Sequence, residues 1–338
     1  MERIPTADIT ACLIVHNEAS VLERCLRSIA PFVDECCIVD SGSTDTTVDI
    51  ALQFGATVSV DPSLADRSGR LRDFAAARNA ALAMARGPWV LSIDADEVLD
   101  IKRPNLVRSL LASQRVHALD VLILSGGVYW HAPRLFLRGP QTRWHDRVHE
   151  WVEIDGPMRR TKALTIKNLP DKAGKESAAD RDLRLCGEQL REEPGNLRAT
   201  FYMARALRYS HRYGEAIAYY DKYWHESDFA AGRYHAALGA AVCSLLLHDF
   251  AASQRFAMRA YRTSPNLAEA CCVLGDAYLG LGRLDLASSW FARALTKKLP
   301  RLDESLFIDP TSYRSYPLSR LRWLHHTQLA TARATRAG

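Results

Sequence analysis

The hydrophobic pattern of this 338-residue chain changes near residue 170, and the change separates two kinds of structure. Before it, short apolar runs rich in branched residues alternate with amphipathic helical stretches. Strands that alternate with helices predict an α/β domain built on a mostly parallel sheet. After it, nearly every segment has the spacing of a helix. At about 150 residues per domain, we expect an α/β domain followed by an all-α domain.

Four short strands are predicted in the first part, each followed by a polar turn. They cover residues 9–15, 36–39, 57–60 and 89–93, and helices are predicted over residues 21–29, 48–54 and 74–85. Residues 119–167 contain short strands with Trp, Tyr and Gly instead, at 121–124, 128–130 and 148–154. We expect these strands to form a mixed or antiparallel edge of the same sheet.

Small residues recur in the second part at a period typical of helical repeats. Ala204, Gly239 and Gly275 lie 35 and 36 residues apart, as do Ala216, Ala251 and Ala287. Small side chains at this spacing let paired helices approach closely, as in tetratricopeptide-type hairpins with a period of about 34 residues. We therefore expect an α/β domain over residues 1–175, tetratricopeptide-like repeats over 176–300 and a helical tail over 301–338.

The tail is rich in arginine. From residue 311 it contains five Arg and no acidic residue, with Tyr313, Tyr316 and Trp323 between them. Two interpretations are open: a terminal helix that caps the repeats, or a surface that binds a nucleic acid or another anion. The formal net charge of +5 permits an acidic ligand without requiring one.

Composition excludes several classes of protein. With 48% hydrophobic and 25% charged residues, the chain is neither disordered nor fibrous. Its eight cysteines contain no CxxC pair, which argues against a zinc site, and a chain of this length needs no disulfides. No signal peptide and no apolar run of about 18 residues is visible. We expect a reduced, cytoplasmic protein without a membrane span.

Acidic residues follow two of the predicted strands. Asp94 and Asp96 follow the fourth strand, and side chains two residues apart in an extended segment point to the same side. Two convergent carboxylates suit a divalent cation that also holds a diphosphate. Asp40 follows the second strand; helix capping accounts for residues 43–45 and leaves Asp40 available to a base or ribose. Ligands of such sheets bind beyond these strand ends.

Four ordered motifs carry a resemblance to a known family: residues 13–18 (LIVHNE), 38–45 (IVDSGSTD), 77–80 (ARNA) and 93–97 (IDADE). Together they resemble the nucleotide-sugar half of family 2 glycosyltransferases, which have the GT-A fold, a Rossmann-like mixed α/β sheet. A catalytic domain followed by helical repeats is similar to the layout of the bacteriocin S-glycosyltransferases. No GxGxxG or GxxxxGK[ST] motif is present, which argues against a dinucleotide cofactor or an ATP-hydrolysing loop.

The resemblance implies roles for individual residues. Asp40 would contact the nucleobase, typically uracil, and Asp94, beside Ala95, would face the ribose or the metal. Asp96 would bind Mn²⁺ or Mg²⁺ that bridges the diphosphate. Arg78 would approach the base or the phosphates, although an exposed Arg on an Ala-rich helix explains it equally. The end of the first strand would line the nucleotide with Val15, Asn17 and Glu18.

A general base is expected within residues 144–151. The resemblance points to His149 and Glu150, with Glu150 as the base and His149 completing the metal site. Adjacent residues on a strand face opposite ways, so both roles together require a bend. Asp146 and His145 are alternatives. Three tryptophans are candidates for stacking on a sugar or for the core: Trp130, Trp144 and Trp151.

The resulting hypothesis is a metal-dependent, inverting glycosyltransferase that uses a nucleotide-diphosphate sugar, with a UDP-sugar as the first choice of donor. The helical repeats favour a peptide or protein acceptor, because such arrays present extended concave surfaces. A modified DNA base and a saccharide or lipid-linked acceptor are alternatives. A repeat scaffold with an inactive α/β domain is the alternative from another class. Family resemblance also allows a homodimer.

Overall fold

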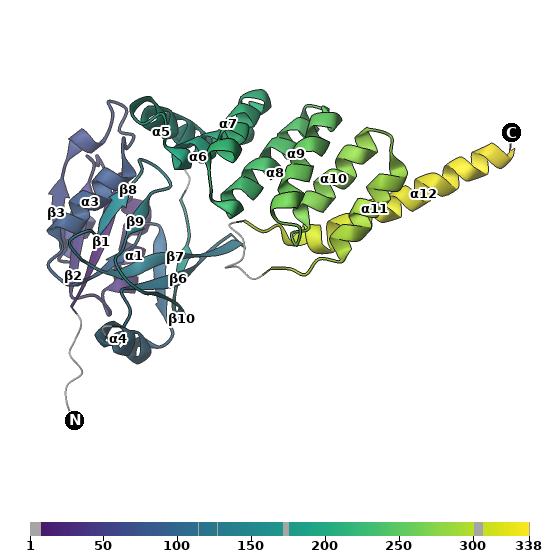
Figure 1. Cartoon of the computed structure of the whole chain (residues 1–338). Helices are drawn as coiled ribbons and strands as arrows, with labels where there is room; N and C mark the ends of the chain where they lie inside the picture. The colour runs from purple at the N-terminus through teal and green to yellow at the C-terminus, as the bar shows by residue number, and fades with distance from the viewer. Residues whose placement is uncertain (1–7, 114, 127, 172–175, 301–306, 338) are drawn as a thin grey trace. The chain divides into compact units, whose positions relative to one another are not determined.

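The chain forms two compact units, residues Met1–Glu176 and Ser177–Gly338, each described here by itself. The computed structural model describes residues 8–113, 115–126, 128–171, 176–300 and 307–337 (Figure 1). The first unit is an α/β domain with a mixed sheet, and the second unit consists of helices.

The first half of the sheet is parallel, as the alternation of strands and helices predicts. Its strands are β1 (Ile9–Val15), β2 (Glu35–Asp40), β3 (Thr57–Val60) and β4 (Trp89–Ser92). They stand in the order β3-β2-β1-β4. The chain adds β2 and β3 on one side of β1 and then β4 on the other side, so the strand order reverses between β1 and β4. In a doubly wound sheet, this reversal opens a crevice at the carboxyl ends of the two strands.

The second half of the sheet has mixed direction. β7 (Val128–Leu137) is antiparallel to both β4 and β6 (Ala118–Ser125), and β10 (Met158–Asn168) is parallel to β6 and antiparallel to β5 (Glu97–Ile101). The predicted mixed edge is confirmed, but β5 and β10 were not predicted as strands. A register shift between Thr161 and Thr165 interrupts the alternation of β10, which hides the strand from sequence. The predicted strand over 148–154 is only β9 (Trp151–Glu153), which forms a separate hairpin with β8 (Arg143–His145).

Helices cover both faces of the sheet. On one face, α1 (Ala19–Ile29), α2 (Thr47–Gln53) and α4 (Pro104–Ala112) share one hydrophobic core with alternate residues of β1 and β4 that include Leu13 and Leu91, and α4 itself contacts β10. On the other face, α3 (Phe74–Met84) and the β8–β9 hairpin pack against the intervening residues, such as Cys12 and Val90. A short 3₁₀ turn, η1 (Pro62–Leu64), follows β3. The polar loops at the strand ends therefore lie at one edge between the two helical layers.

The second unit is a series of antiparallel helical hairpins (Figure 1). Each helix packs against the next in the chain, and none of the described helices is both long and apolar enough to cross a membrane. The helices are α5 (Ala178–Glu192), α6 (Leu197–Tyr209), α7 (Tyr213–Glu226), α8 (Ala230–Leu246), α9 (Phe250–Thr263), α10 (Glu269–Gly280), α11 (Leu284–Leu295) and α12 (Ser315–Ala337), with a 3₁₀ turn, η2 (Pro310–Tyr313), before the last.

The predicted register of the middle hairpin is wrong. The three hairpins turn at His211, His248 and Gly282, each with a positive φ angle, so the true spacings are 37 and 34 residues. Ala216, Ser253 and Ala287 each follow a turn by five residues and are fully buried, whereas Ala251 is exposed. The two true spacings average to the predicted 35–36 residues. For this reason the sequence pattern placed Ala251 in one series with Ala216 and Ala287, and Gly239 in another with Ala204 and Gly275.

The start of α12 packs on the preceding helices. Leu324 is buried with Phe291 of α11, and the Tyr316 hydroxyl donates to Asp276 Oδ2 at 2.6 Å. Arg320 also donates to Asp276, at 2.6 Å from Nη2. This part of the tail therefore caps the helical array, and its first arginine in the helix is neutralised.

The eight cysteines are all free thiols, and seven of them are buried. Burial raises the pKa of the Cys37 thiol to about 11 and that of Cys36 to about 12. A protonated thiol is a poor nucleophile, so these adjacent cysteines are packing residues.

Gly275 is required by the packing of α10 on α11. A Cβ at this position would lie 2.5 Å from Cε1 of Phe291, which is fully buried and cannot move aside. We predict that Gly275→Ala lowers the free energy of unfolding by about 1–2 kcal/mol, because overpacking outweighs the better helix propensity of Ala. Urea unfolding measures this difference.

Gly187→Ala is the matched control. Gly187 also lies inside a helix, but its Cβ would meet only Met203 Cε at an ordinary 3.5 Å. We expect Gly187→Ala to be neutral or stabilising by up to about 1 kcal/mol. Equal effects of the two substitutions would contradict the packing argument.

Candidate active site

Two loops meet at the carboxyl edge of the parallel strands. Asn17 follows β1 with φ +53°, and its Oδ1 accepts from the Thr44 N–H at 2.8 Å in the loop after β2. In return, the Asn17 N–H donates to Ser43 Oγ at 2.8 Å, and the Glu18 N–H donates to Thr47 Oγ1 at 2.8 Å. A positive φ is uncommon outside glycine, so these bonds hold a strained turn in place.

Asp40 organises the second of these loops. Its Oδ1 accepts from the N–H groups of Gly42 and Ser43 at 2.8 and 2.7 Å, and its Oδ2 accepts from the Ser43 hydroxyl. The side chain has no exposed surface. Asp40 thus stabilises its own turn, a role that the sequence pattern assigned to residues 43–45 alone, and its contact with a nucleobase stays a prediction. Val15 is likewise buried, and its carbonyl accepts from the Ser41 N–H at 3.1 Å.

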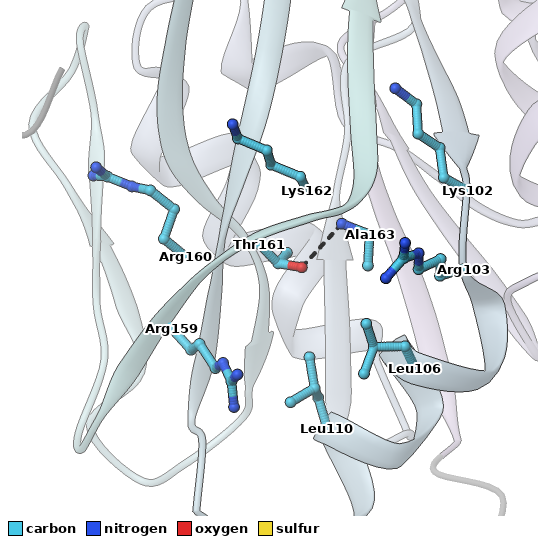
Figure 2. Close-up of a pocket in the computed structure, with 9 residues that line it drawn as sticks. All are labelled: Lys102, Arg103, Leu106, Leu110, Arg159, Arg160, Thr161, Lys162 and Ala163. Atoms are coloured by element: carbon cyan, nitrogen blue, oxygen red, sulfur yellow. Dashed lines mark hydrogen bonds between the residues drawn. The ribbon is translucent and has the colours of Figure 1, made fainter. Parts of the chain in front are cut away.

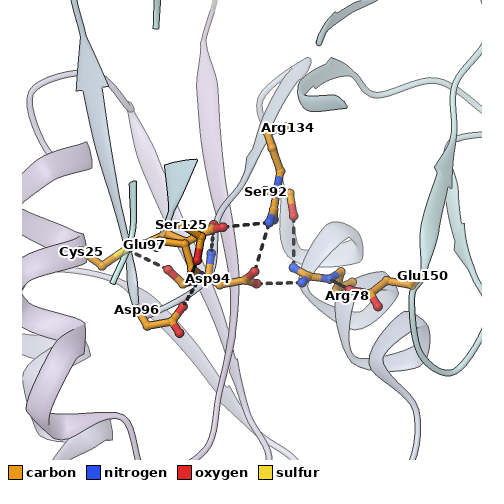
Figure 3. Close-up of polar contacts among 10 residues, drawn as sticks. Cys25, Arg78, Ser92, Asp94, Asp96, Glu97, Ser125, Arg134 and Glu150 are labelled. Carbon is orange, nitrogen blue, oxygen red and sulfur yellow. Dashed lines mark hydrogen bonds and ion pairs between the residues drawn. The ribbon is translucent and has the colours of Figure 1, made fainter. Parts of the chain in front are cut away.

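Arg78 of α3 is the centre of a buried polar cluster (Figure 3). Its Nε donates to Glu150 Oε1 at 2.7 Å and its Nη2 donates to Asp94 Oδ1 at 2.7 Å. Nη1 donates to Ser92 Oγ at 3.2 Å, and the guanidinium lies 5.1 Å from the centre of the Trp144 ring. All three nitrogens are thus engaged and the side chain is only 8% exposed. The interpretation of Arg78 as an exposed residue is therefore wrong, and its approach to a base or phosphate stays a prediction.

A second buried arginine, Arg134 of β7, was not predicted. Its Nη2 donates to Asp94 Oδ2 at 3.2 Å and to Glu97 Oε1 at 2.9 Å, while Glu97 Oε2 accepts from the Asp94 N–H at 2.9 Å. Burial raises the pKa of Glu97. Burial alone would also raise the pKa of Asp94, but Arg78 and Arg134 together hold it well below its usual range. A charged residue directly before the apolar pair Leu135-Phe136 was the only sequence signal for Arg134.

Asp94 and Asp96 do not converge. β4 ends at Ser92 and β5 begins at Glu97, and between them the chain turns, with the Glu97 N–H donating to the Asp94 carbonyl at 3.0 Å. Because the segment is a turn and not an extended strand, the two carboxylates separate. Asp94 faces the arginines, whereas Asp96 points away from them, where its Oδ1 accepts from Asn168 Nδ2 at 3.4 Å (Figure 3). Ala95 between them is buried.

The residues fit a divalent cation only in part. Both oxygens of Asp94 accept from arginine, and no three His, Cys, Asp or Glu residues of the described ranges lie together as a metal site. The expected set of Asp94, Asp96 and His149 is therefore not assembled by the protein. Asp96 is partly exposed. One carboxylate suits the mode in which Mg²⁺ is held mainly by substrate phosphates and water.

The segment of the expected base is bent. Asp146 and His149 have positive φ angles of 69° and 54°, so His149 and Glu150 are not adjacent residues of a regular strand. The bend that both proposed roles require is present. Among the three candidates for the base, Glu150 alone is linked to Asp94 through Arg78.

The other two candidates hold the β8–β9 hairpin together. His145 Nε2 lies 2.9 Å from Glu153 Oε2, and the Trp151 indole stacks on the His145 ring at 4.6 Å. Trp151 Nε1 donates to Asp146 Oδ2 at 3.0 Å. Of the three tryptophans, Trp144 is buried and belongs to the core, whereas Trp130 and Trp151 are exposed.

Removal of the Arg78 guanidinium should destabilise the first unit. Arg78→Met leaves Asp94 and Glu150 without their shared partner in a largely buried cluster, so we predict a loss of about 3 kcal/mol in the free energy of unfolding. Arg86→Met is the control: Arg86 pairs with Glu35 at 2.6 Å but is 83% exposed, and its loss should cost less than about 1 kcal/mol. Similar losses in urea unfolding would contradict the central role of Arg78.

Comparison with known proteins identifies relatives of parts of the chain. The chain is 39% identical over 151 residues to a TPR repeat-containing protein of Synechococcus elongatus, covering 44% of this chain and 36% of the relative. It is 28% identical over 240 residues to the glycosyltransferase SunS of Bacillus phage SPbeta, covering 65% of this chain and 54% of the relative. The chain thus spans about a third to a half of the length of these relatives.

Solved structures resemble the chain more distantly. A MamA fragment from Desulfovibrio magneticus RS-1 is 18% identical with a TM-score of 0.34, covering 45% of this chain and 88% of that one. The family model for glycosyl transferase family 2 matches residues 10–182, half of the chain and nearly all of the first unit. The chain belongs to glycosyltransferase family 2.

Proposed function

We propose that this glycosyltransferase is an inverting enzyme that transfers a sugar from a nucleotide-diphosphate donor to a macromolecular acceptor. A UDP-sugar is the first choice of donor. The observation that carries the proposal is the cluster around Arg78, which fixes Asp94 and Glu150 beside the carboxyl end of β4. Family 2 membership supplies the reaction class. Ligands of doubly wound sheets bind beyond this edge, next to the switch between β1 and β4.

On the donor side, we assign different roles to the three acidic residues at the strand ends. Asp40 accepts from its own turn and Asp94 accepts from two arginines, while Asp96 points away from those arginines. In this proposal Asp96 binds Mn²⁺ or Mg²⁺ together with the donor diphosphate. When bound, such a cation would neutralise the charge that develops on the leaving nucleotide. The joined loops after β1 and β2, including Asn17 and Glu18, form the wall against the nucleotide.

On the acceptor side, we assign the general base to Glu150. Inversion requires a carboxylate that takes the proton of the acceptor as it attacks the anomeric carbon. Arg78 holds Glu150 Oε1 and thereby fixes the carboxylate relative to Asp94. Arg78 is therefore a positioning residue and Glu150 the residue that accepts the proton.

The acceptor is proposed to be a peptide or protein. The support for this is the second unit, whose three hairpins and flanking helices form an array of the kind that presents extended binding surfaces. The alternative of a DNA base rested on the arginine-rich tail, and Arg320 of that tail is already paired with Asp276.

Donor use can be tested before the acceptor is known. We predict slow, metal-dependent nucleotide release from one member of a panel of UDP-, GDP- and TDP-sugars, with Mn²⁺ and with chelator. Asp96→Ala should abolish release while the unfolding transition stays unchanged, since Asp96 lies outside the buried cluster around Arg78 and points away from its arginines. Unchanged turnover in Asp96→Ala would remove the assignment of this residue. If nucleotide diphosphates with Mn²⁺ also leave the melting temperature unchanged, a repeat scaffold becomes the better interpretation.

The base assignment has its own test. Glu150→Gln keeps an oxygen that accepts from Arg78 Nε but cannot take a proton. We predict a decrease in kcat for transfer of about 10²–10⁴-fold with unchanged donor affinity. Asp146→Asn is the matched control and should keep kcat within a few-fold. A large effect of Asp146→Asn with a small effect of Glu150→Gln would move the base to Asp146.

A further inference from the structure

A cavity of about 420 Å³ lies in the first unit away from the candidate active site. It is open to solvent on one side and is lined by the start of α4 and the first half of β10 (Figure 2). Its lining contains five cations and no acidic residue: Lys102, Arg103, Leu106, Leu110, Arg159, Arg160, Thr161, Lys162 and Ala163. Its volume is within the range of small-ligand sites.

The register of the sheet separates this cavity from the candidate active site. β5 and β10 are antiparallel, with Glu97 opposite Asn168 at one end and Ile101 opposite Leu164 at the other. The acidic turn adjoins the first end, and the cavity adjoins the second. Five residues of strand span about 13 Å, so a ligand in the cavity does not occupy the donor site.

The cations of the cavity are mostly unneutralised. Arg160 is paired with Asp120 at 2.8 Å and, in Figure 2, extends away from the other lining residues. Within the described ranges, the side chains of Lys102, Arg103, Arg159 and Lys162 have no ion pair or hydrogen bond. Four like charges around one hollow repel each other, and a multiply charged anion would relieve that repulsion.

The backbone adds to the positive potential. Arg103 is the N-cap residue of α4, a helix of nine residues that has no side-chain cap and no acidic residue in its first turn. Helix N-termini without a cap have free N–H groups and a positive partial charge. The Lys102 and Arg103 N–H groups both donate to the Ala163 carbonyl, at 2.8 and 3.1 Å, and fix this end of the helix against β10.

One part of the cavity wall is apolar. Leu106 and Leu110 lie between Arg103 and Arg159 in Figure 2, and Leu106 is 43% exposed. We infer that the cavity between α4 and β10 binds a phosphate group, carried either by a small soluble molecule or by a lipid. Arginine matches the planar, bidentate geometry of phosphate contacts, and the two leucines accommodate the apolar part of the ligand.

The first arm of the test uses inorganic pyrophosphate. The full chain carries Asp96→Ala and is titrated calorimetrically with chelator present, so that metal-dependent binding at the donor site does not contribute. Arg103→Gln/Arg159→Gln should weaken binding by about tenfold or more, because two charge-assisted contacts are lost. The control of equal charge, Arg27→Gln/Arg67→Gln, removes exposed arginines elsewhere on the same unit and should bind as before. Circular dichroism checks that both variants fold.

The second arm uses vesicles of phosphatidylcholine with and without phosphatidic acid. Co-sedimentation that requires phosphatidic acid and is lost in Arg103→Gln/Arg159→Gln identifies a lipid-borne phosphate. Pyrophosphate binding without vesicle capture identifies a soluble ligand. Should the arginine pair prevent folding, Lys102→Gln/Lys162→Gln at the same cavity replaces it. The inference is overturned if neither probe binds, or if the cavity variants and the control lose binding equally.

Discussion

One guanidinium joins three segments of the first unit that are distant in sequence. Arg78 of α3 holds Ser92 at the end of β4, Asp94 in the turn that follows and Glu150 after the β8–β9 bend. Hydrogen bonds in such a low-dielectric cluster are strong, and an unpaired member is costly. The cluster therefore requires a complete set of partners, and Arg134 completes it by neutralising the remaining oxygen of Asp94. The positions of Asp94, Glu97 and Glu150 follow from that requirement.

The same requirement distinguishes the acidic residues of this edge by what they contact. Asp40 accepts hydrogen bonds from two backbone N–H groups of its own turn, and Asp94 accepts hydrogen bonds from two arginines. The charge of Asp94 is therefore already matched inside the protein by two guanidinium groups. Asp96 points away from the arginines, and its Oδ1 accepts from Asn168 Nδ2 at 3.4 Å. Two acidic residues that look alike in the sequence thus have different physical tasks.

Much of the fold follows from local sequence patterns, and the failures have physical causes. The strands β1 and β3 have the predicted bounds because apolar residues between polar turns define them. β10 was missed because its first half is exposed and a register shift breaks its alternation. Asp94 and Asp96 were expected to converge because an extended segment was assumed, and the turn before Glu97 overrides that assumption. Arg134 contributes through a tertiary contact that no local spacing encodes.

The charge of the first unit is distributed along β5 and β10. At the end where Glu97 faces Asn168, buried arginines are matched by carboxylates, so the positive charge there serves to position acidic groups. At the opposite end, where Ile101 faces Leu164, the cations of the cavity are exposed and mostly unmatched. A surface arginine that only aids solubility gains nothing from neighbours of its own sign around a hollow. The unmatched charge at that end is therefore better explained by an anionic ligand than by stability.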